Sequence, residues 1–91
     1  MSKNTEDINK KFEKAASKIK ESNLNLDNDT LLTLYCYYKQ ATEGDCNIEA
    51  PSFFDFKGKA KYDAWLQHKG VGQETAMKKY IKKVKSLLEN N

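Results

Sequence analysis

The chain has 91 residues, which is enough for one small domain but not for a second hydrophobic core. Its apolar content of 38% and charged content of 32% fit a helical bundle and exclude a membrane protein, because no apolar run approaches the roughly 20 residues that a membrane-spanning helix needs. All 16 basic residues behind the net charge of +3 are lysine, and the lack of arginine argues against a nucleic-acid partner, since nucleic-acid readers generally use arginine for bidentate contacts.

The N-terminal run MSKNTEDINKKFEK has no apolar core of a secretory signal. We therefore expect a cytoplasmic protein, with a nuclear or organellar location left open. The two cysteines, Cys36 and Cys46, match no zinc spacing because no histidine lies near them in the sequence. We predict two free thiols in a reducing compartment and no metal site, with a disulfide as the alternative.

The first apolar segment has the i, i+4, i+7, i+8, i+11 spacing of one buried helical face. Its members are Ile8, Phe12, Ala15, Ala16 and Ile19. The pattern predicts a helix from about Thr5, acting as N-cap, to Lys20. The other lysines are expected on a solvated face: Lys10, Lys11, Lys14 and Lys18.

Residues 22–28 are rich in Asn and Asp, which favour turns and caps. A second helix is predicted from Asp27 or Asn28 to about Glu43, with Gly44 ending it. A stripe on this helix is expected to face the core: Leu31, Leu34, Tyr38 and Ala41. An adjacent edge carries Leu32, Tyr35 and Lys39. Tyr37 points to the opposite side and is expected to be exposed.

Residues 45–54 form a loop that is long for so small a domain. Long loops in compact domains are often functional, and a well-packed connector is an equally good interpretation here. Pro51 stiffens the loop, while Ile48, Phe53 and Phe54 are expected to pack it down.

A third helix is predicted from Asp55, as its cap, to Lys69, with Gly70 beyond its end. One arc of this helix holds Lys57, Lys61, Ala64 and His68, while Lys59 faces away. Trp65 and Ala60 are expected to reach the core. Gly58, in the first turn, would let another group approach closely.

The fourth helix is predicted from Gly72 or Gln73 to Leu88 and has the clearest amphipathic pattern. Its apolar face consists of Ala76, Met77, Tyr80, Ile81, Val84, Leu87 and Leu88. Its other side is expected to face solvent: Lys78, Lys79, Lys82, Lys83 and Lys85.

Two clusters in residues 35–65 combine aromatic and lysine side chains. At about 100° per residue, one arc of roughly 120° on the second helix holds Leu31, Leu32, Tyr35, Tyr38 and Lys39. Lys57 and Lys61 are four apart and share one face of the third helix. Such a surface suits a ligand with a flat base, several phosphates and an apolar tail, although three solvated lysines are the simpler interpretation.

Catalysis finds little support in the sequence. The one histidine, His68, falls in the predicted last turn of the third helix, where a cation suits the helix dipole. A thiol–imidazole pair of Cys36 with His68, serving acyl transfer, is the one nucleophilic arrangement that stays open. There is no glycine-rich phosphate loop or nucleotide fingerprint. We therefore predict a protein that is not an enzyme, with no catalytic residues.

The motifs of this region resemble the acyl-CoA-binding protein family. The resemblance rests on YKQAT at 38–42, Gly44-Asp45, Pro51, DFKGKAK at 55–61 and Asp63-Ala64-Trp65, and it continues through Gly70 and AMKKYI at 76–81. It implies one acyl-CoA-binding domain over residues 1–91, folded as an all-α antiparallel four-helix bundle with up-down-down-up order. It also implies a carrier and pool former for medium- to long-chain acyl-CoA esters in lipid metabolism, with no cofactor.

The resemblance carries roles onto ten residues: Lys20, Leu31, Leu32, Tyr35, Tyr38, Lys39, Phe56, Lys57, Lys61 and Tyr80. Tyr35 and Lys39 resemble contacts to the ribose 3′-phosphate, and Tyr38 with the Lys39 stem resembles the adenine platform. Lys20 and Lys61 resemble further phosphate contacts, and Lys57 lines the same site. Tyr80 resembles the tyrosine that closes over the nucleotide end. The acyl groove would be lined by Leu31, Leu32 and Phe56.

Three departures from the family pattern stand out. Tyr62 replaces a common second tryptophan, Gly72 replaces a commoner Ser or Thr cap, and the first loop has no proline. The resemblance implies a monomer whose partners are acyl-CoA esters, and it leaves open transient contact with acyl-CoA-using enzymes or membrane surfaces. The alternative function is a helical protein-interaction module that binds acidic partners through its lysine faces and has no lipid ligand.

Overall fold

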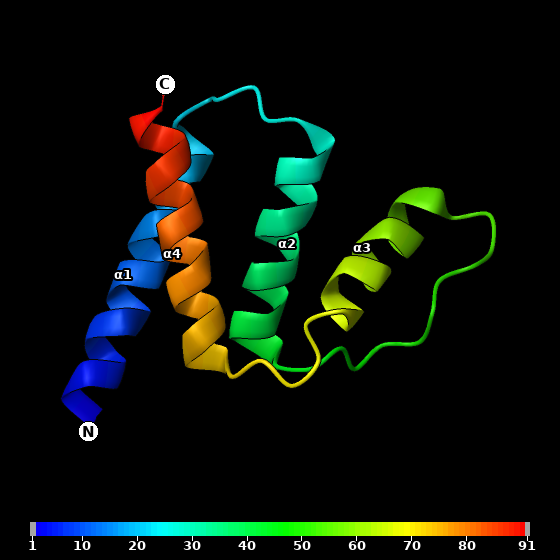
Figure 1. Ribbon diagram of the computed structural model, residues 1–91, viewed down its shortest axis with the longest axis horizontal. Helices are drawn as coiled ribbons and strands as arrows, with labels where there is room; N and C mark the ends of the chain where they lie inside the picture. The colour runs from blue at the N-terminus through cyan, green and yellow to red at the C-terminus, as the bar shows by residue number, and fades with distance from the viewer. Residues whose placement is uncertain (1, 91) are drawn as a thin grey trace.

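The computed structural model describes residues 2–90, with side chains from residue 7 onward. Over this range it contains four helices and no strand: α1 (Ser2–Glu21), α2 (Asn28–Glu43), α3 (Phe56–Leu66) and α4 (Gln73–Glu89). In Figure 1, α1 and α4 run upward while α2 and α3 run downward. The predicted all-α fold with its up-down-down-up order is therefore confirmed.

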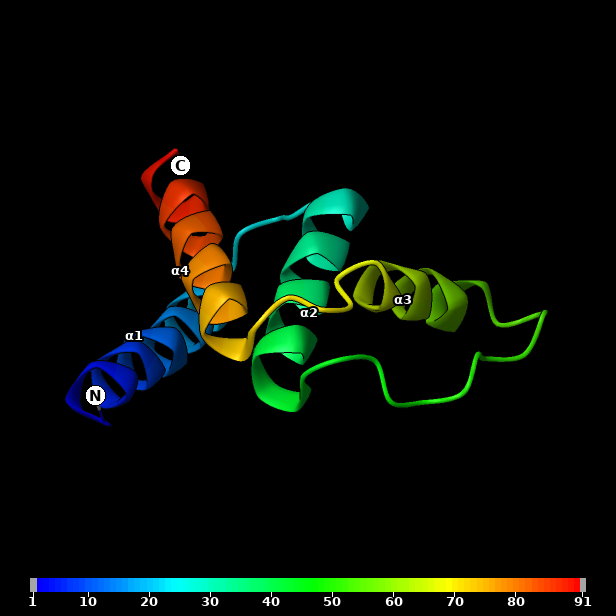
Figure 2. The same cartoon turned by 60° about the horizontal axis from the view of Figure 1, so that its bottom comes forward.

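The helices form a flat array with extents of 42 × 34 × 16 Å. α4 lies between α1 and α2, and α3 packs on α2 (Figure 1). Because α2 and α3 are neighbours that run in the same direction, the chain must return along their length before α3 can begin. This geometry accounts for the long connection over residues 44–55, which forms an outer edge of the molecule in both Figure 1 and Figure 2.

Two aspartates begin helices as the sequence predicted. The backbone N–H of Thr30 donates to Asp27 Oδ1 at 2.8 Å at the start of α2, and that of Gly58 donates to Asp55 Oδ1 at 2.9 Å at the start of α3. A Cβ at Gly58 would collide with the Asp55 carboxylate. The group that approaches Gly58 closely is therefore the cap itself.

Two other helix boundaries differ from the prediction. α1 begins at Ser2, so Thr5 lies inside the helix and does not cap it. α3 ends at Leu66, and His68 lies in the following turn, where its N–H donates to the Trp65 carbonyl at 2.9 Å. Gly70 takes a left-handed φ of 90° at the end of this turn. The tight turn replaces the last helical turn that periodicity had predicted.

The hydrophobic core forms where α1, α2 and α4 meet. Its buried residues are Phe12, Ala15, Leu34, Ala41, Ala76, Tyr80 and Val84. Trp65 of α3 is fully buried, as predicted, and its indole N–H donates to the Gly44 carbonyl at 2.9 Å. This bond attaches α3 to the carboxyl end of α2. Among the described helices, α3 packs on α2 alone.

Several predicted exposures are wrong. Leu31 and Tyr38, placed on the core-facing stripe of α2, are 50% and 42% exposed. Tyr37 is half-buried instead of exposed, because the turn after α3 covers it and His68 packs edge-on against its ring at 5.3 Å. Phe53 and Phe54 do not pack the loop down but stand open to solvent.

A polar cluster joins the ends of three helices. Asp45 Oδ1 accepts hydrogen bonds from the Gly70 N–H at 2.8 Å and from Gln40 Nε2 at 2.9 Å. Gln40 is fully buried, and its Nε2 also donates to the Val71 carbonyl at 2.8 Å. These two hydrogen bonds lower the pKa of Asp45 below its ordinary value, and the one from the Gly70 backbone has the larger effect. The cluster holds the turn between α3 and α4 against the end of α2.

Candidate ligand-binding site

α2 and α3 leave a hollow of about 410 Å³ between them. Its lining consists of Asn28, Leu31, Leu32, Phe56, Lys57, Ala60 and Lys61. The volume falls in the range of small-molecule sites, about 300–1,000 Å³. Residues from two helices that are distant in the sequence thus meet in one place, including every side chain that the resemblance assigned to the acyl groove.

The hollow between α2 and α3 combines an apolar surface with positive charge. Leu31 is half-exposed and Phe56 is 74% exposed, so both offer apolar area that another molecule can cover. Lys57 and Lys61 extend from successive turns of α3 beside them. An amphiphile with an anionic end and an apolar tail is complementary to this arrangement.

Lys61 links the hollow to the aromatic face of α2. Its Nζ lies 5.4 Å from the centre of the Tyr35 ring, within cation–π range. The contact draws an ammonium group of α3 toward α2. A polar surface therefore continues from the hollow along α2 toward Lys39.

Lys39 is held by two neighbours. Its Nζ lies 5.0 Å from the centre of the Trp65 ring and forms an ion pair with Glu43, one helical turn along α2. The hydrogen bond to Glu43 is the main cause that raises the pKa of Lys39 above its ordinary value. Glu43 is not among the predicted site residues, although its i, i+4 spacing from Lys39 is the signal for such a pair.

Three aromatic rings from three helices meet around Tyr38, the residue before Lys39 in the chain. Tyr38 of α2 stacks on Phe12 of α1 at 5.4 Å and lies 5.8 Å from Tyr80 of α4. Phe12 and Tyr80 meet edge to face at 5.0 Å. Burial raises the pKa of Tyr80 above its ordinary value. Phe12, which the sequence analysis assigned to the core alone, thus supports a partly exposed Tyr38 face on which a flat ring can stack.

Lys20 takes no part in these contacts. It is exposed near the end of α1, one residue before the helix ends. Its predicted phosphate contact therefore depends on the reach of a flexible side chain. The other nine predicted residues lie in or beside the aromatic and lysine surface of α2, α3 and α4.

Cys36 and His68 approach one another on a different side of α2. Their Sγ and Nε2 atoms are 3.9 Å apart, while the thiol donates to the Thr33 carbonyl at 3.1 Å. Cys36 is buried, and its burial raises the thiol pKa. A nucleophilic cysteine needs a lowered pKa and access to its substrate. A hollow of about 310 Å³ is lined by both side chains, so it is the burial of the thiol and its raised pKa that argue against the thiol-dependent acyl-transfer alternative.

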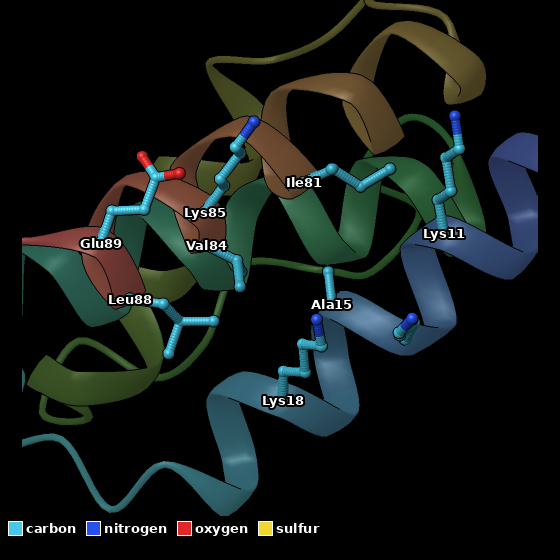
Figure 3. Close-up of a pocket in the computed structure, with 9 residues that line it drawn as sticks. Lys11, Ala15, Lys18, Ile81, Val84, Lys85, Leu88 and Glu89 are labelled. Atoms are coloured by element: carbon cyan, nitrogen blue, oxygen red, sulfur yellow. The ribbon is translucent and has the colours of Figure 1, made fainter.

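A second hollow, of about 400 Å³, lies between α1 and α4 (Figure 3). Its walls consist of Lys11, Lys14, Ala15, Lys18, Ile81, Val84, Lys85, Leu88 and Glu89. Four lysines that the sequence analysis placed on solvated faces therefore surround an apolar floor. None of the ten predicted site residues contributes to it.

Among the described residues, no cluster of His, Cys, Asp and Glu side chains could hold a metal ion. Within the same part of the chain, no helix combines the length and apolar character that a membrane crossing requires. Both cysteines are free thiols, as predicted, with Cys36 buried and Cys46 half-buried.

Comparison with known proteins places this geometry in a family. The profile of the family described as "Acyl CoA binding protein" matches residues 9–84. The chain is 43% identical over 84 residues to a protein of the genus Hypsibius named "Putative acyl-CoA-binding protein", covering 92% of this chain and 94% of that protein. It is 44% identical over 79 residues to the diazepam-binding inhibitor-like 5 protein of Rattus norvegicus, covering 87% and 91% of the two chains.

Solved structures of acyl-CoA-binding proteins are also similar to this chain. The crystal structure of acyl-CoA-binding protein 2 from Oryza sativa aligns with a TM-score of 0.86 and 41% identity, covering 91% of this chain and 92% of that one. The acyl-CoA-binding protein from Moniliophthora perniciosa aligns with a TM-score of 0.82 and 40% identity, covering 90% and 81%. With the family profile, close relatives and matching folds all in agreement, the chain belongs to the acyl-CoA-binding protein family.

Proposed function

We propose that this protein binds medium- to long-chain acyl-CoA esters, with the acyl chain between α2 and α3 and the CoA head on the lysine and tyrosine side chains nearby. The observation that carries the proposal is the hollow in which Leu31, Leu32 and Phe56 lie beside Lys57 and Lys61. One surface thus offers both the apolar contact for a tail and the positive charge for phosphates.

Each part of the head would meet a complementary group. Lys39 and Tyr35 would bind the 3′-phosphate, with Lys39 exchanging its Glu43 partner for the phosphate. Adenine would stack on Tyr38, which Phe12 supports from behind. Tyr80 is only 5% exposed, so it would support the Tyr38 stacking face instead of closing over the nucleotide as the resemblance implies. Lys20 would reach the phosphates from the end of α1.

The tail and the head contribute differently to the binding free energy. Burying a sixteen-carbon chain removes roughly fifteen CH₂ and CH₃ groups from water, a gross gain of about 12 kcal/mol. Ordering and association costs offset much of that gain. Exposed lysines contribute less per contact, and a free fatty acid, with one carboxylate and no phosphates, can use fewer of them. Affinity is therefore expected to rise with chain length, while the phosphates determine which amphiphile binds.

Calorimetric titration with palmitoyl-CoA tests the proposal through two matched lysines. Lys61 lines the hollow, whereas Lys59 projects from the same helix and pairs with Asp63 at 3.5 Å. Lys61→Ala should weaken binding by about tenfold, the effect of losing one partly exposed charge-assisted contact. Lys59→Ala should leave affinity unchanged. Equal losses in both variants would mean that general positive charge, rather than this site, attracts the ligand.

The same proposal covers the protein's wider role. It would act without catalysis as a cytoplasmic, monomeric carrier and pool former in lipid metabolism, in transient contact with acyl-CoA-using enzymes or membrane surfaces. Two free thiols suit a reducing compartment. The raised thiol pKa of the buried Cys36 supports the absence of nucleophilic chemistry.

The alternative, a protein-interaction module without a lipid ligand, draws support from the hollow between α1 and α4. Its apolar floor and four lysines would suit an acidic amphipathic helix. Replacing Lys14 and Lys18 by Glu distinguishes the two functions. If the protein is a carrier, the variant keeps its affinity for palmitoyl-CoA. If it is an interaction module, the unaltered protein binds an acidic amphipathic peptide, the variant does not, and neither binds palmitoyl-CoA.

A further inference from the structure

The chain presents two phenylalanines at the corners of a tight turn. The N–H of Asp55 donates to the Ser52 carbonyl at 2.9 Å, which closes a turn with Phe53 and Phe54 at its two central positions. Such corners usually carry Gly, Pro, Asn, Asp or Ser. Here the two rings meet edge to face at 5.5 Å and are 77% and 81% exposed. This places a compact aromatic tip in solvent.

The turn is anchored and does not hang freely. Asp55 both closes it and caps α3, since its carboxylate accepts the Gly58 N–H at 2.9 Å and its carbonyl accepts the Lys59 N–H at 2.9 Å. The N–H of Phe54 also donates to Ser52 Oγ at 3.3 Å. The connection that carries the turn forms an outer edge of the molecule (Figures 1 and 2). The rings are therefore presented outward from a fixed base.

The surroundings of the turn indicate what the rings contact. Phe56, which is 74% exposed, follows directly and lines the hollow between α2 and α3, and Lys57 and Lys61 flank the same opening. Exposed aromatic rings bordered by lysines are typical of segments that lie in a membrane interface, with the rings among the acyl chains and the ammonium groups near the headgroups. The proposed ligand also has an acyl tail that partitions into bilayers.

We propose that the Phe53–Phe54 turn docks this protein on phospholipid bilayer surfaces, with the mouth of the acyl site held at the interface. The purpose of this docking rests on the proposed function: the acyl tail would pass between the site and the bilayer with little exposure to water. The docking itself needs no ligand. Insertion of two uncharged rings gives attraction that salt does not screen, in contrast to adsorption through lysines.

Vesicle co-sedimentation of the ligand-free full chain tests the inference directly. The probes are phosphatidylcholine vesicles with and without a minor fraction of phosphatidylserine, each at low and at high salt. The test variant carries Phe53→Ser together with Phe54→Ser. The control is Leu66→Ser, which removes another exposed apolar side chain from the opposite end of α3. Circular dichroism checks that both variants are folded.

The unaltered protein and the Leu66→Ser control should partition onto both kinds of vesicle, and should keep most of that binding at high salt. The double variant should partition at least about tenfold more weakly, because two rings no longer leave water. Titration of the double variant with palmitoyl-CoA in the absence of vesicles separates this inference from the proposed function. Retained ligand affinity with lost partitioning supports docking by the turn.

Three results would overturn the inference. The unaltered protein could fail to bind vesicles, the double variant could bind them as well as the control, or high salt could abolish binding. Failure to bind vesicles would indicate that the turn binds a pocket on another protein. The other two results would mean that other surfaces or the lysines adsorb the protein to vesicles. Each result stands whether or not palmitoyl-CoA binds in solution.

Discussion

The indole N–H of Trp65 donates to the carbonyl oxygen of Gly44 at 2.9 Å, and this bond joins α3 to the end of α2. Trp65 is fully buried, and α2 is the one described helix on which α3 packs. Because Lys57 and Lys61 belong to α3, their position relative to Leu31 and Tyr35 depends on this junction. Both the stability of the fold and the shape of the proposed site therefore depend on this one hydrogen bond.

Trp65→Phe should destabilise the protein by about 1–3 kcal/mol, since it leaves the Gly44 carbonyl without its donor and leaves space beside the ring. Urea unfolding followed by far-ultraviolet circular dichroism measures the effect, because Trp65 is the chain's one tryptophan and its fluorescence is lost with it. The exposed neighbour Leu66→Ala is the control. A change of less than about 0.5 kcal/mol, as at an ordinary surface site, would contradict this role.

Glu43→Gln should tighten palmitoyl-CoA binding by up to about fivefold. Glu43 forms an ion pair with Lys39, and a phosphate can bind Lys39 only after that pair opens. Exposed pairs of this kind are worth about 0.2–1 kcal/mol, which sets the size of the gain. Titration calorimetry measures it. Asp63→Asn is the matched control, because it breaks the i, i+4 pair with Lys59 and should leave affinity unchanged. Weaker binding of Glu43→Gln would show that Glu43 positions Lys39 instead of competing for it.

Stability should fall in acid, and Asp45→Asn should reduce that fall. Hydrogen bonds from Gly70 and Gln40 hold the pKa of Asp45 below its ordinary value. An aspartate whose pKa is lower in the folded state stabilises the protein above its unfolded-state pKa, near 3.9, and this contribution is lost as the pH falls through the folded-state pKa. Urea unfolding across this acidic range, compared between the two proteins, measures it. Identical pH profiles would contradict the importance of the Asp45 bonds.

Gly72→Ser should stabilise the protein by a few tenths of a kcal/mol up to about 1 kcal/mol. Gly72 precedes α4 with extended backbone angles, φ −63° and ψ 151°, which any residue can adopt, and it offers no side chain to cap the helix. A serine hydroxyl can accept one of the free N–H groups of the first turn, and the unfolded chain loses freedom. Thermal unfolding measures the gain. Gly72→Ala is the control, because it lacks the hydroxyl, and an equal gain from alanine would rule out capping as the cause.

Local chemistry made much of the fold predictable. Asp27 and Asp55 have the side chains that cap helices, and both helix starts were predicted correctly. The apolar spacing of α4 identified Ala76, Tyr80 and Val84, which are buried. Thr5 carried the same capping signal yet lies inside α1, because the residues before it also adopt helix and the signal does not fix which polar residue comes first.

The exposure of individual side chains depended on how the helices pack, which periodicity does not specify. Tyr37 was expected in solvent, but the turn that carries His68 folds over it. Leu31 was expected in the core, but it lines the hollow between α2 and α3 and is half-exposed. The reach of Lys61 to the Tyr35 ring follows from the same packing. The residue types of the site were thus evident in the sequence, whereas their meeting place required the structure.

The most direct test of the carrier function is calorimetric titration with palmitoyl-CoA, beside CoA and palmitate as separate ligands. Tight one-to-one binding of the ester, weak binding of CoA and no binding of palmitate are predicted, because the apolar hollow supplies affinity and the lysines supply recognition of the phosphates. Equal affinity for palmitate and palmitoyl-CoA would contradict the role of the lysines. No binding of the ester would contradict the carrier function itself.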